Sequence, residues 1–495
     1  MRALLLHPDR AFDIAAPASL DTTPFARDLE LQILLDAATG GDKHLQTVMA
    51  AAFTASFAND ADTVRHRQAV LADALADPAG LRDLYAIACE PFGRDRYWEF
   101  SLYGHNPSAK VSSAVRTLRS CLGVLRRLRD RCAVMAPRFH SAGLRGFHET
   151  LQHDLDDPYL EAAEADLQTL MFRKGVLISA GIGGGGGAAG ITLRKPQKRD
   201  VSWLQSVLTP GGPSYTIQLA PRDDAGAQTF ATLQNGGLSL ISDALYAAAQ
   251  HVLAFVTATR AELAFYVAAL NLHDRLAAIG ETVAFPDLSE SGAAFHCCNL
   301  RDPSLALTMG RPAVGNDVDA DGRPLIVITG ANRGGKSTFL RSAGLAQVML
   351  QCGLFVTADA FAASLRTGLF THHRREEDRT MRSGKFDEEL VRMDAIADAV
   401  RPGGLVLFNE SFAATNEREG SDVARQIVTA LLDSGVAVIF VTHMSEFARA
   451  FFGDERTRFL RADRGADGTR SFRLQTAEPL TESFGRDLYE RIFAA

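Results

Sequence analysis

The sequence GANRGGKST at residues 330–338 fits the pattern G-x-x-x-x-G-K-[ST] of a phosphate-binding loop. The run LIVIT at 325–329 comes directly before it and is apolar and mostly β-branched, as expected of a buried strand. Residues 339–350 follow with apolar and polar positions at helical spacing. A strand, a glycine-rich loop and a helix start would bring backbone N–H groups and the positive end of a helix dipole around one phosphate.

A glycine turn between a strand and a helix is the alternative explanation of this stretch. The pair Lys336 and Ser337 and the flanking elements favour phosphate binding, because a simple turn requires none of them. Lys336 is expected to reach the outer phosphates of a nucleotide, and the Ser337 hydroxyl to ligate Mg²⁺. The predicted nucleotide-binding residues are Gly330, Ala331, Asn332, Arg333, Gly334, Gly335, Lys336, Ser337 and Thr338.

Length and composition limit the class of protein. A chain of 495 residues exceeds one ordinary core, so two or more domains are expected. The net charge of -7 argues against a generally basic nucleic-acid-binding surface but is compatible with a local basic patch. The six cysteines form no CxxC motif, which favours a reduced, cytoplasmic protein. The N-terminal apolar run is too short for a signal peptide, and no stretch is expected to cross a membrane.

The first part of the chain is predicted to be mainly helical. Residues 25–88 carry helical patterns, with a helix start at Asp62 and a break at Asp77 and Pro78. A helix at 108–135 is rich in arginine, and these side chains either form a solvated face or contact a phosphate backbone. The arginines are Arg116, Arg119, Arg126, Arg127, Arg129 and Arg131.

A glycine-rich segment interrupts the helices. GIGGGGGAAG at 181–190 lies between two apolar runs at 176–179 and 191–194, and it contains the pattern G-x-G-x-x-G. Because a strand and not a helix is expected to follow, we interpret it as a loop joining two strands and not as a dinucleotide site. A basic cluster comes next and either contacts a nucleic-acid backbone or forms a solvated rim. Its members are Arg194, Lys195, Lys198 and Arg199, and a third strand is predicted at 216–219.

A further helix is expected at 161–172, before the glycine-rich segment. After that segment, helical patterns resume near residue 233 and run to about 279, and 261–270 is predicted to be mostly buried. Pro286 marks a boundary. After it, short apolar strands alternate with helical patterns, which is typical of a parallel sheet covered by helices.

Polar side chains follow two of these predicted strands. GLVLFNE at 404–410 ends in Asn409 and Glu410, and VAVIFV at 436–441 is followed by Thr442 and His443. The carboxyl ends of parallel strands are where ligands bind in such sheets. Glu410 is expected to orient and polarise an attacking water, and His443 to sense the γ-phosphate. Asn409 stands where an acidic Mg²⁺ ligand is usual, so its amide oxygen should support the metal more weakly.

These segments together resemble the MutS mismatch-repair ATPases. Residues 329–338 match the T-G-x-N-x-G-G-K-S-T pattern of that family, and Thr442 with His443 matches its Thr-His switch. Further similar segments follow the family's order: 314–318, 368–371 with Asp378 downstream, the signature position at 383–389, and 408–416. The resemblance is strong over about 290–495 and weaker over 1–290, where the helix with Arg67 and Gln68 and the helix at 261–270 resemble the family's core and lever.

The sequence also departs from the family pattern. Asn409 replaces the usual Asp, Arg333 replaces an apolar residue, and the signature stretch matches loosely. We see no room for mismatch-reading and connector domains before the helical region, nor a tetramerising tail. The tripeptide at 147–149 has the form of the family's Phe-x-Glu wedge, but it lies in a helical pattern and is interpreted as a chance match.

The resemblance implies an α/β P-loop NTPase domain of the ABC/MutS-like type at 290–495. A mainly α-helical core and lever domain would precede it at 1–289, with a small β insertion at about 176–230. The expected function is ATP-dependent DNA binding of the MutS type, with ATP hydrolysed in a composite site of a homodimer to drive lever movement. DNA contacts would be mainly to the backbone. The implied catalytic residues are Lys336, Glu410 and His443, the metal ligands Ser337 and Asn409, and the cofactors ATP and Mg²⁺.

Two other functions are considered. A nucleotide-dependent switch or scaffold, with low ATPase activity and no mismatch recognition, is favoured by Asn409 and the net negative charge. A transporter or chromosome-scaffold ATPase is disfavoured, because there is no L-S-G-G-Q signature and no room for long heptads between the phosphate loop and Glu410.

Overall fold

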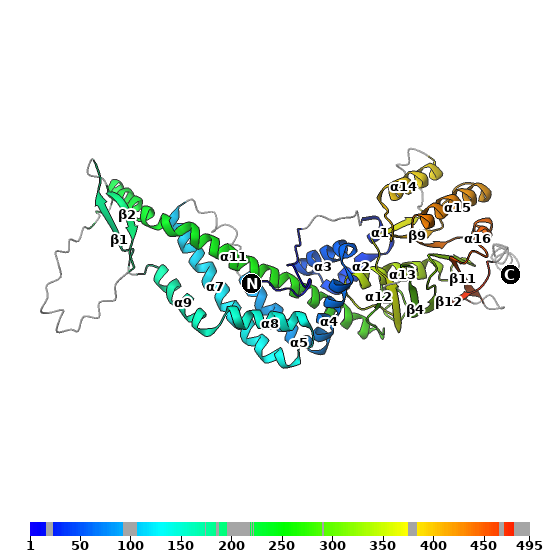
Figure 1. The fold of residues 1–495 in the computed structure, drawn as a ribbon, viewed down its shortest axis with the longest axis horizontal. Helices are drawn as coiled ribbons and strands as arrows, with labels where there is room; N and C mark the ends of the chain where they lie inside the picture. Colours follow the sequence, from blue (N-terminus) through cyan, green and yellow to red (C-terminus); the bar gives the residue numbers. More distant parts are fainter. Residues whose placement is uncertain are drawn as a thin grey trace. The chain divides into compact units, whose positions relative to one another are not determined.

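The computed structural model describes residues 1–15, 23–92, 106–173, 175–184, 188–195, 218, 220, 222–289, 292–374, 384–464 and 470–479. It divides into two compact units (Figure 1). Unit 1 comprises Met1–Ala3, Asp83–Pro137 and Phe147–Arg260, and unit 2 comprises Leu4–Arg82, Arg138–Gly146 and Ala261–Ala495. These bounds differ from the predicted domains at 1–289 and 290–495, because the first helices of the chain pack with the C-terminal sheet.

Unit 1 is built mainly from helices. They are α7 (Pro107–Met135), α8 (Ala142–Asp154), α9 (Asp157–Leu170) and the first part of α11 (Asp224–Ala278), with α5 (Pro78–Cys89) and η2 (Glu90–Phe92) entering from the chain before them. The side chain of Asn106 caps α7 by accepting from Ser108 N, and Pro107 occupies the first turn. A buried stripe at helical spacing, including Val111, Leu118 and Leu125, forms its core face.

The arginines of α7 mostly form ion pairs within unit 1. Arg127 pairs with Glu90 at 2.5 Å, and Arg129 pairs with Asp157 at 2.7 Å. Arg126 and Arg131 likewise lie 3.2 Å from Glu164 and 2.7 Å from Asp83. These partners favour the solvated, ion-paired face over the phosphate-facing helix. Phe147 is 1% exposed within α8, so the tripeptide at 147–149 presents no wedge.

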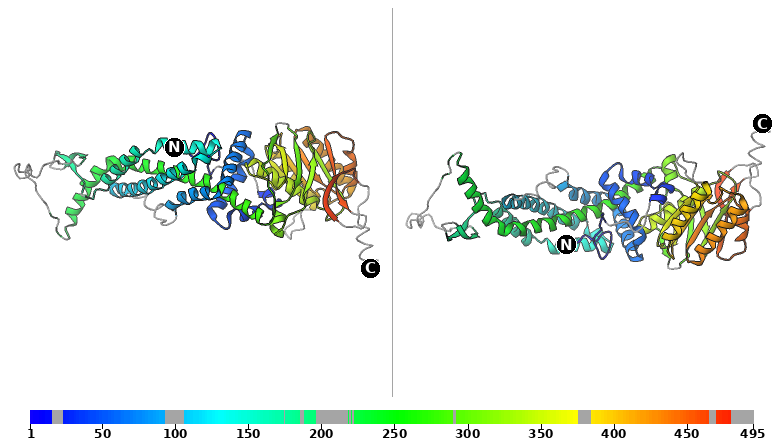
Figure 2. Two further views of the ribbon diagram at one scale, coloured as in Figure 1. Left: turned by 90° about the horizontal axis from the view of Figure 1, so that it is seen from below. Right: turned by 90° about the horizontal axis from the view of Figure 1, so that it is seen from above.

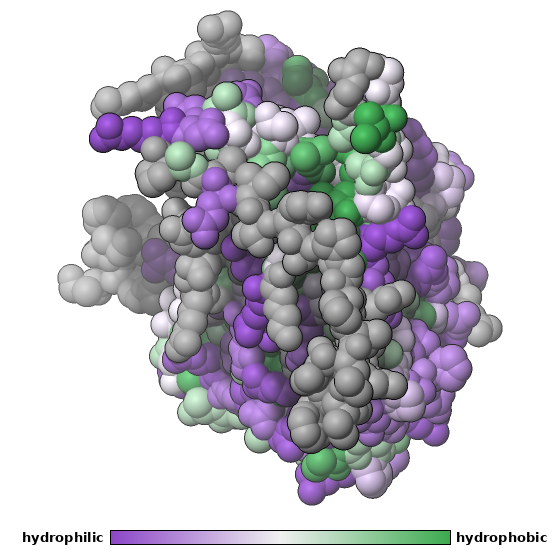
Figure 3. Space-filling view, turned by 90° about the vertical axis from the view of Figure 1, so that its left-hand side faces the viewer, coloured by the Kyte–Doolittle hydropathy of each residue, from purple (hydrophilic) through white to green (hydrophobic). Residues whose placement is uncertain are grey.

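A two-stranded antiparallel sheet lies where the β insertion was predicted. It consists of β1 (Ile178–Ile182) and β2 (Ala188–Leu193), with Ile178 opposite Leu193. The predicted residues Lys198 and Arg199 lie outside the described residues, as does the strand at 216–219 except for Gln218, which is in no strand. The face of the molecule that carries this sheet mixes apolar and hydrophilic side chains (Figure 3). Ile182 is 91% exposed, and Arg194 donates through Nε to Ser179 Oγ at 2.9 Å.

The long helix α11 corrects one prediction. Within the described residues it is the one helix long and apolar enough to cross a membrane by length and composition, whereas no such stretch was expected. The most apolar window of the helix is 67% buried inside the protein. Core helices of soluble proteins meet the same criteria, and the predicted buried segment at 261–270 lies in this helix.

The main sheet of unit 2 has six strands in the order β12-β11-β6-β10-β9-β8. Five strands are parallel: β6 (Leu325–Thr329), β8 (Leu369–His373), β9 (Leu405–Asn409), β10 (Ala437–Val441) and β11 (Thr457–Arg464). The edge strand β12 (Arg470–Thr476) is antiparallel to β11. The predicted parallel sheet of an α/β fold is thereby confirmed. A smaller sheet, β3-β7-β4-β5, comprises Asp287–Ser289, Ala360–Ser364, Phe295–Leu300 and Asn316–Asp319.

Helices cover both faces of the main sheet (Figure 2). One face packs on α14 (Lys385–Ala399), α15 (Glu417–Asp433) and α16 (Ser445–Ala450) through a buried apolar cluster that includes Val406, Phe408 and Phe440. The intervening residue Leu407 faces the opposite side, where α13 (Lys336–Gln351) approaches closely enough that a Cβ on Gly344 would lie 2.7 Å from Leu407 Cδ1. The fully buried strands therefore explain the continuous apolar runs of the sequence.

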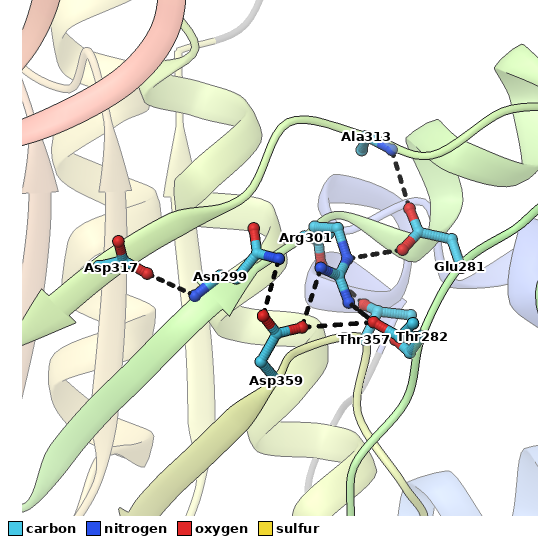
Figure 4. A network of polar contacts seen from close by, with 8 residues as sticks. All are labelled: Glu281, Thr282, Asn299, Arg301, Ala313, Asp317, Thr357 and Asp359. Carbon is cyan, nitrogen blue, oxygen red and sulfur yellow. Dashed lines mark hydrogen bonds and ion pairs between the residues drawn. The ribbon is translucent and has the colours of Figure 1, made fainter.

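A polar network joins the smaller sheet to the chain around it (Figure 4). Arg301, 7% exposed, pairs through Nε with Glu281 at 2.6 Å and through Nη1 with Asp359 at 3.3 Å. Glu281 also accepts from Ala313 N at 2.8 Å, and Asn299 donates to Asp359 at 3.0 Å. A short helix, α12 (Pro303–Met309), follows Arg301. The network fixes the segment before β5 by pairing the buried guanidinium with two carboxylates.

The N-terminal helices α1 (Thr23–Asp28), α2 (Leu31–Thr39), α3 (Lys43–Ala55), η1 (Ser56–Ala58) and α4 (Ala61–Ala76) belong to unit 2. Thr371 of β8 donates to Asp28 at 2.7 Å. Asn59 donates to Gln351 O, at the end of α13, at 2.8 Å. These buried contacts tie the start of the chain to the sheet.

Arg67 on α4 is the centre of this junction and is fully buried. Its Nε donates to Leu6 O at 2.8 Å, and Nη1 donates to Cys352 O at 3.4 Å. Nη2 lies 3.0 Å from His7 Nε2. Burial, and then the charge of Arg67, lowers the pKa of His7 to about 3, so the neutral ring accepts this bond. The guanidinium also lies 5.6 Å from the centre of the Phe265 ring.

Replacing Arg67 with Met should destabilise unit 2, because the side-chain volume is kept while buried carbonyl groups lose their donor. We expect a loss of about 1–3 kcal/mol, measured as a lower thermal midpoint and greater urea sensitivity. Arg65→Met on the same helix is the matched control, because Arg65 is 52% exposed and pairs only with Asp62 on the surface. Equal midpoints for the two variants would contradict this account.

Candidate nucleotide-binding site

The loop between β6 and α13 is shaped by left-handed backbone conformations. Gly330, Arg333 and Gly335 have φ of 111°, 59° and 91°. Gly335 precedes the first residue of α13, and a Cβ there would lie 3.0 Å from Phe472 O, so this position requires glycine. The first backbone bond into the helix is donated by Phe339 N to Gly335 O at 2.9 Å. The N–H groups of the three residues before Phe339 therefore lie at the helix start, where an anion binds.

Lys336 is the first residue of α13 and is 4% exposed. Its Nζ donates to Gly330 O at 2.8 Å and to Ala331 O at 3.1 Å. Burial lowers the pKa of Lys336 to about 8, against the opposing charge of Glu410. The ammonium is thus held at the loop with part of its hydration removed.

The ends of β9 and β10 supply the remaining groups. Ser337 Oγ donates to Asn409 Oδ1 at 2.9 Å. His443 Nε2 lies 2.8 Å from Glu410 Oε1 and 3.5 Å from Lys336 Nζ. A nitrogen whose hydrogen is donated to Glu410 has no lone pair left for Lys336, so the longer approach is a contact and not a second hydrogen bond. The hydrogen bond from His443 is the main cause that lowers the pKa of Glu410, which keeps this carboxyl ionised near neutral pH.

The five predicted catalytic and metal-binding residues therefore lie together at one edge of the sheet. Around them, Gly334 is buried, Asn332 and Arg333 are exposed, and Ala331 and Thr338 are half-buried. The predicted signature stretch begins at Ser383, which lies outside the described residues. Asp378 lies outside the described residues as well. The later part of the signature stretch forms the start of α14.

Three polar residues beside the site were not singled out individually, although Glu389 and Ser411 lie within the predicted stretches at 383–389 and 408–416. They are His372 on β8, Glu389 on α14 and Ser411 after Glu410, and all three are buried. No short motif connects them, because the contacts that they make are separated by 17, 23 or 39 positions in the chain. The sequence signals are the polar residue directly after the Asn409 and Glu410 pair and the acidic residue that ends the stretch at 383–389.

The residues present fit a nucleotide with Mg²⁺. Oxygen atoms of Ser337 and Asn409 are ligands that Mg²⁺ accepts, and helix-start N–H groups with an ammonium suit its phosphates. Among the described residues there is no group of three or more His, Cys, Asp and Glu side chains that could hold a metal ion without such a ligand. A metal here would depend on phosphate oxygens as well.

Comparison with known proteins gives matches in both units. Residues 59–279 match the family model described as the MutS2 N-terminal domain, and residues 326–463 match the one described as MutS domain V. The chain is 30% identical over 197 residues to the DNA mismatch repair protein MutS of Chloroflexus aurantiacus, which covers 36% of this chain and 20% of the relative. It is 32% identical over 202 residues to Endonuclease MutS2 of an Anaeromyxobacter species. This alignment covers 39% of this chain and 24% of the relative.

A mammalian relative gives a similar match. MutS protein homolog 4 of Mus musculus is 28% identical over 186 residues, which covers 34% of this chain and 19% of the relative. The chain thus spans about a fifth to a quarter of the length of these three relatives.

The affinity of this site for ATP or ADP should fall as the pH rises through about 8. Above its pKa of about 8, Lys336 loses the charge that attracts phosphate, so binding should weaken by up to about tenfold per pH unit. Titration calorimetry or fluorescence titration between pH 6.5 and 9.5 measures this. Lys336→Arg should flatten the dependence, because a guanidinium stays protonated throughout this range. An unmodified protein with constant affinity over the range would contradict the prediction.

Proposed function

We propose, because this chain belongs to the MutS family, that it binds and hydrolyses ATP and couples this to DNA binding. The observation that carries the proposal is the meeting of Lys336, Ser337, Asn409, Glu410 and His443 beside the N-terminus of α13. A phosphate loop, a metal-supporting pair and a carboxylate held by a histidine are the parts that ATP hydrolysis needs.

Each residue then has a defined role. The N–H groups at the start of α13 and the Lys336 ammonium bind the phosphates and stabilise the charge that develops on them. Bound ATP supplies the phosphoanhydride bond, and Mg²⁺ bound with it neutralises phosphate charge. Glu410, ionised at neutral pH, orients the attacking water and accepts its proton. His443 holds the Glu410 carboxylate through the bond at 2.8 Å.

Asn409 should make the metal site weaker than an acidic pair would. Its amide oxygen accepts from Ser337 but carries no charge, so Mg²⁺ retention would rely more on the phosphates of the ligand. We therefore expect hydrolysis with a high Mg²⁺ requirement.

DNA binding and assembly form the second part of the proposal. Two copies would complete each nucleotide site, with the stretch at 383–389 of one copy reaching the nucleotide of the other. DNA contacts would come from unit 1 and would be mainly to phosphates. The exposed cations Arg194 and Lys195 beside the hairpin support this assignment. A cytoplasmic protein that crosses no membrane fits these functions.

A nucleotide-dependent switch or scaffold with low turnover is the second candidate. The uncharged Asn409 favours it, and so do the arginines of α7, whose charges are matched by acids in the same unit. The two candidates differ in turnover number and in DNA retention, and each of these two quantities can be measured.

Two substitutions test hydrolysis. Lys336→Ala should abolish tight ATP binding, because the one buried cation of the described phosphate loop is removed. Glu410→Gln should leave ATP affinity nearly unchanged and lower kcat by about 10²- to 10⁴-fold, because the general base is lost. Phosphate release and nucleotide titration give the two readouts. Glu455→Gln is the matched control, since Glu455 is exposed and lies just before β11, whose first residue pairs with Leu325 at the opposite edge of the sheet from the site. Full turnover by Lys336→Ala would end the proposal.

Salt dependence tests DNA binding. Retention of duplex or branched DNA with ATP present should weaken as salt rises, because phosphate neutralisation releases counterions. Replacing Arg194 and Lys195 with Ala should weaken binding and reduce the salt slope by at most about 2. The control replaces Lys43 and Arg65, two surface cations of unit 2, with Ala. No retention at low salt would leave the switch or scaffold as the function.

A further inference from the structure

The backbone that carries Glu410 is held in an unusual conformation. Glu410 and Phe412 have φ of 54° and 62°, in the left-handed region that side chains other than glycine rarely adopt. Such conformations persist only where the surroundings enforce them, and they gather at functional sites. On one side, Glu410 N donates to Val441 O at 2.9 Å, which ties it to the end of β10.

His372 on β8 holds the next residue, Ser411. Both residues are fully buried. Ser411 Oγ donates to His372 O at 2.5 Å and lies 2.7 Å from His372 Nδ1, while His372 Nε2 lies 2.9 Å from Glu389 O. A carbonyl can only accept, so Nε2 carries the hydrogen that it donates to Glu389 O. The ring therefore joins Ser411 to the backbone of α14.

Glu389 on α14 holds Phe412, the residue after Ser411. Its Oε2 accepts from Phe412 N at 2.9 Å, and the Glu389 side chain is buried, with the residue 3% exposed. This bond satisfies an N–H that the left-handed backbone directs away from the sheet ladder. Loss of the acceptor would leave a buried N–H without its partner.

Packing completes the arrangement around Phe412. Its ring stacks on the His372 ring, with centroids 5.1 Å apart and an interplanar angle of 15°. Gly420 of α15 lies against Phe412 O so closely that a Cβ at this position would collide with it. The segment after Glu410 is therefore fixed from β8, α14 and α15 at once.

We propose that His372 and Glu389 are positioning residues that hold Glu410 in place for hydrolysis, so that the position of α14 controls the proposed ATPase activity. The inference rests on the proposed function. Because Glu389 contacts the backbone two residues after Glu410, a shift of α14 alters the Glu410 backbone without touching the phosphate loop. The start of α14 is the later part of the stretch at 383–389 that is predicted to reach a second copy, so association of two copies is the event that would move it.

The test replaces Glu389 with Leu, which removes the acceptor, and with Gln, which keeps an amide oxygen able to accept from Phe412 N. Glu389→Leu should lower kcat by roughly tenfold to a hundredfold, because displacing a catalytic group by about 1 Å has this effect. ATP affinity should stay within about twofold. Glu389→Gln should keep most of the turnover. Equal kcat in the Glu389→Leu variant and the unmodified protein would overturn the inference. A loss of ATP affinity as large as the loss of kcat would overturn it too.

Two further variants test whether misfolding causes the loss of kcat in Glu389→Leu. Ser411→Ala is a smaller change that removes only the hydroxyl between Ser411 and His372, and it should give a loss of kcat in the same direction with unchanged ATP affinity. In a Glu410→Gln background, Glu389→Leu should cause no further loss, since it acts through Glu410. A further loss there would assign Glu389 a different role and overturn the inference. If Glu410→Gln alone does not lower the turnover, the proposed function itself is wrong.

Discussion

One buried guanidinium links the parts of unit 2 that are far apart in sequence. Arg67 binds the N-terminal segment through Leu6 O and the end of α13 through Cys352 O. A buried carboxylate, Glu262 on α11, holds the same segment from the other side by accepting from Leu5 N at 2.5 Å and Phe12 N at 3.2 Å. Buried charges persist only where such partners satisfy them. The start of the chain is therefore as much part of this unit as the sheet.

The candidate site shows where the fold departs from regular geometry. Within the described residues near the sheet edge, Arg333, Glu410 and Phe412 adopt left-handed conformations although none is glycine. The strands that precede them are regular and are buried except at Asn409, so the strain is confined to the segments that follow. A rigid sheet with strained strand ends is how a fold keeps reactive side chains in one orientation.

The parallel sheet and its helices could be predicted because their signals are local. The strands ending at Thr329, Asn409 and Val441 are continuous apolar runs next to polar residues, and the arginine-rich helix matches α7 almost to the residue. That Leu4–Arg82 belongs to unit 2 could not be predicted, because it depends on contacts such as that of Arg67 with Cys352, separated by 285 positions. The contacts of His372 and Glu389 with the segment after Glu410 were not predicted for the same reason.

The helix α13 connects two of these features directly. It runs from Lys336 to Gln351, is buried along nearly its whole length and spans about 24 Å at 1.5 Å per residue. Its last turn is clamped by Asn59 and by Gln351 Nε2, which donates to Arg366 O at 3.0 Å. Because a rigid helix held in this way moves as a whole, its phosphate-loop end cannot shift without disturbing the contacts of Asn59 and Gln351. A ligand bound at the start of α13 would therefore be linked mechanically to the N-terminal helices.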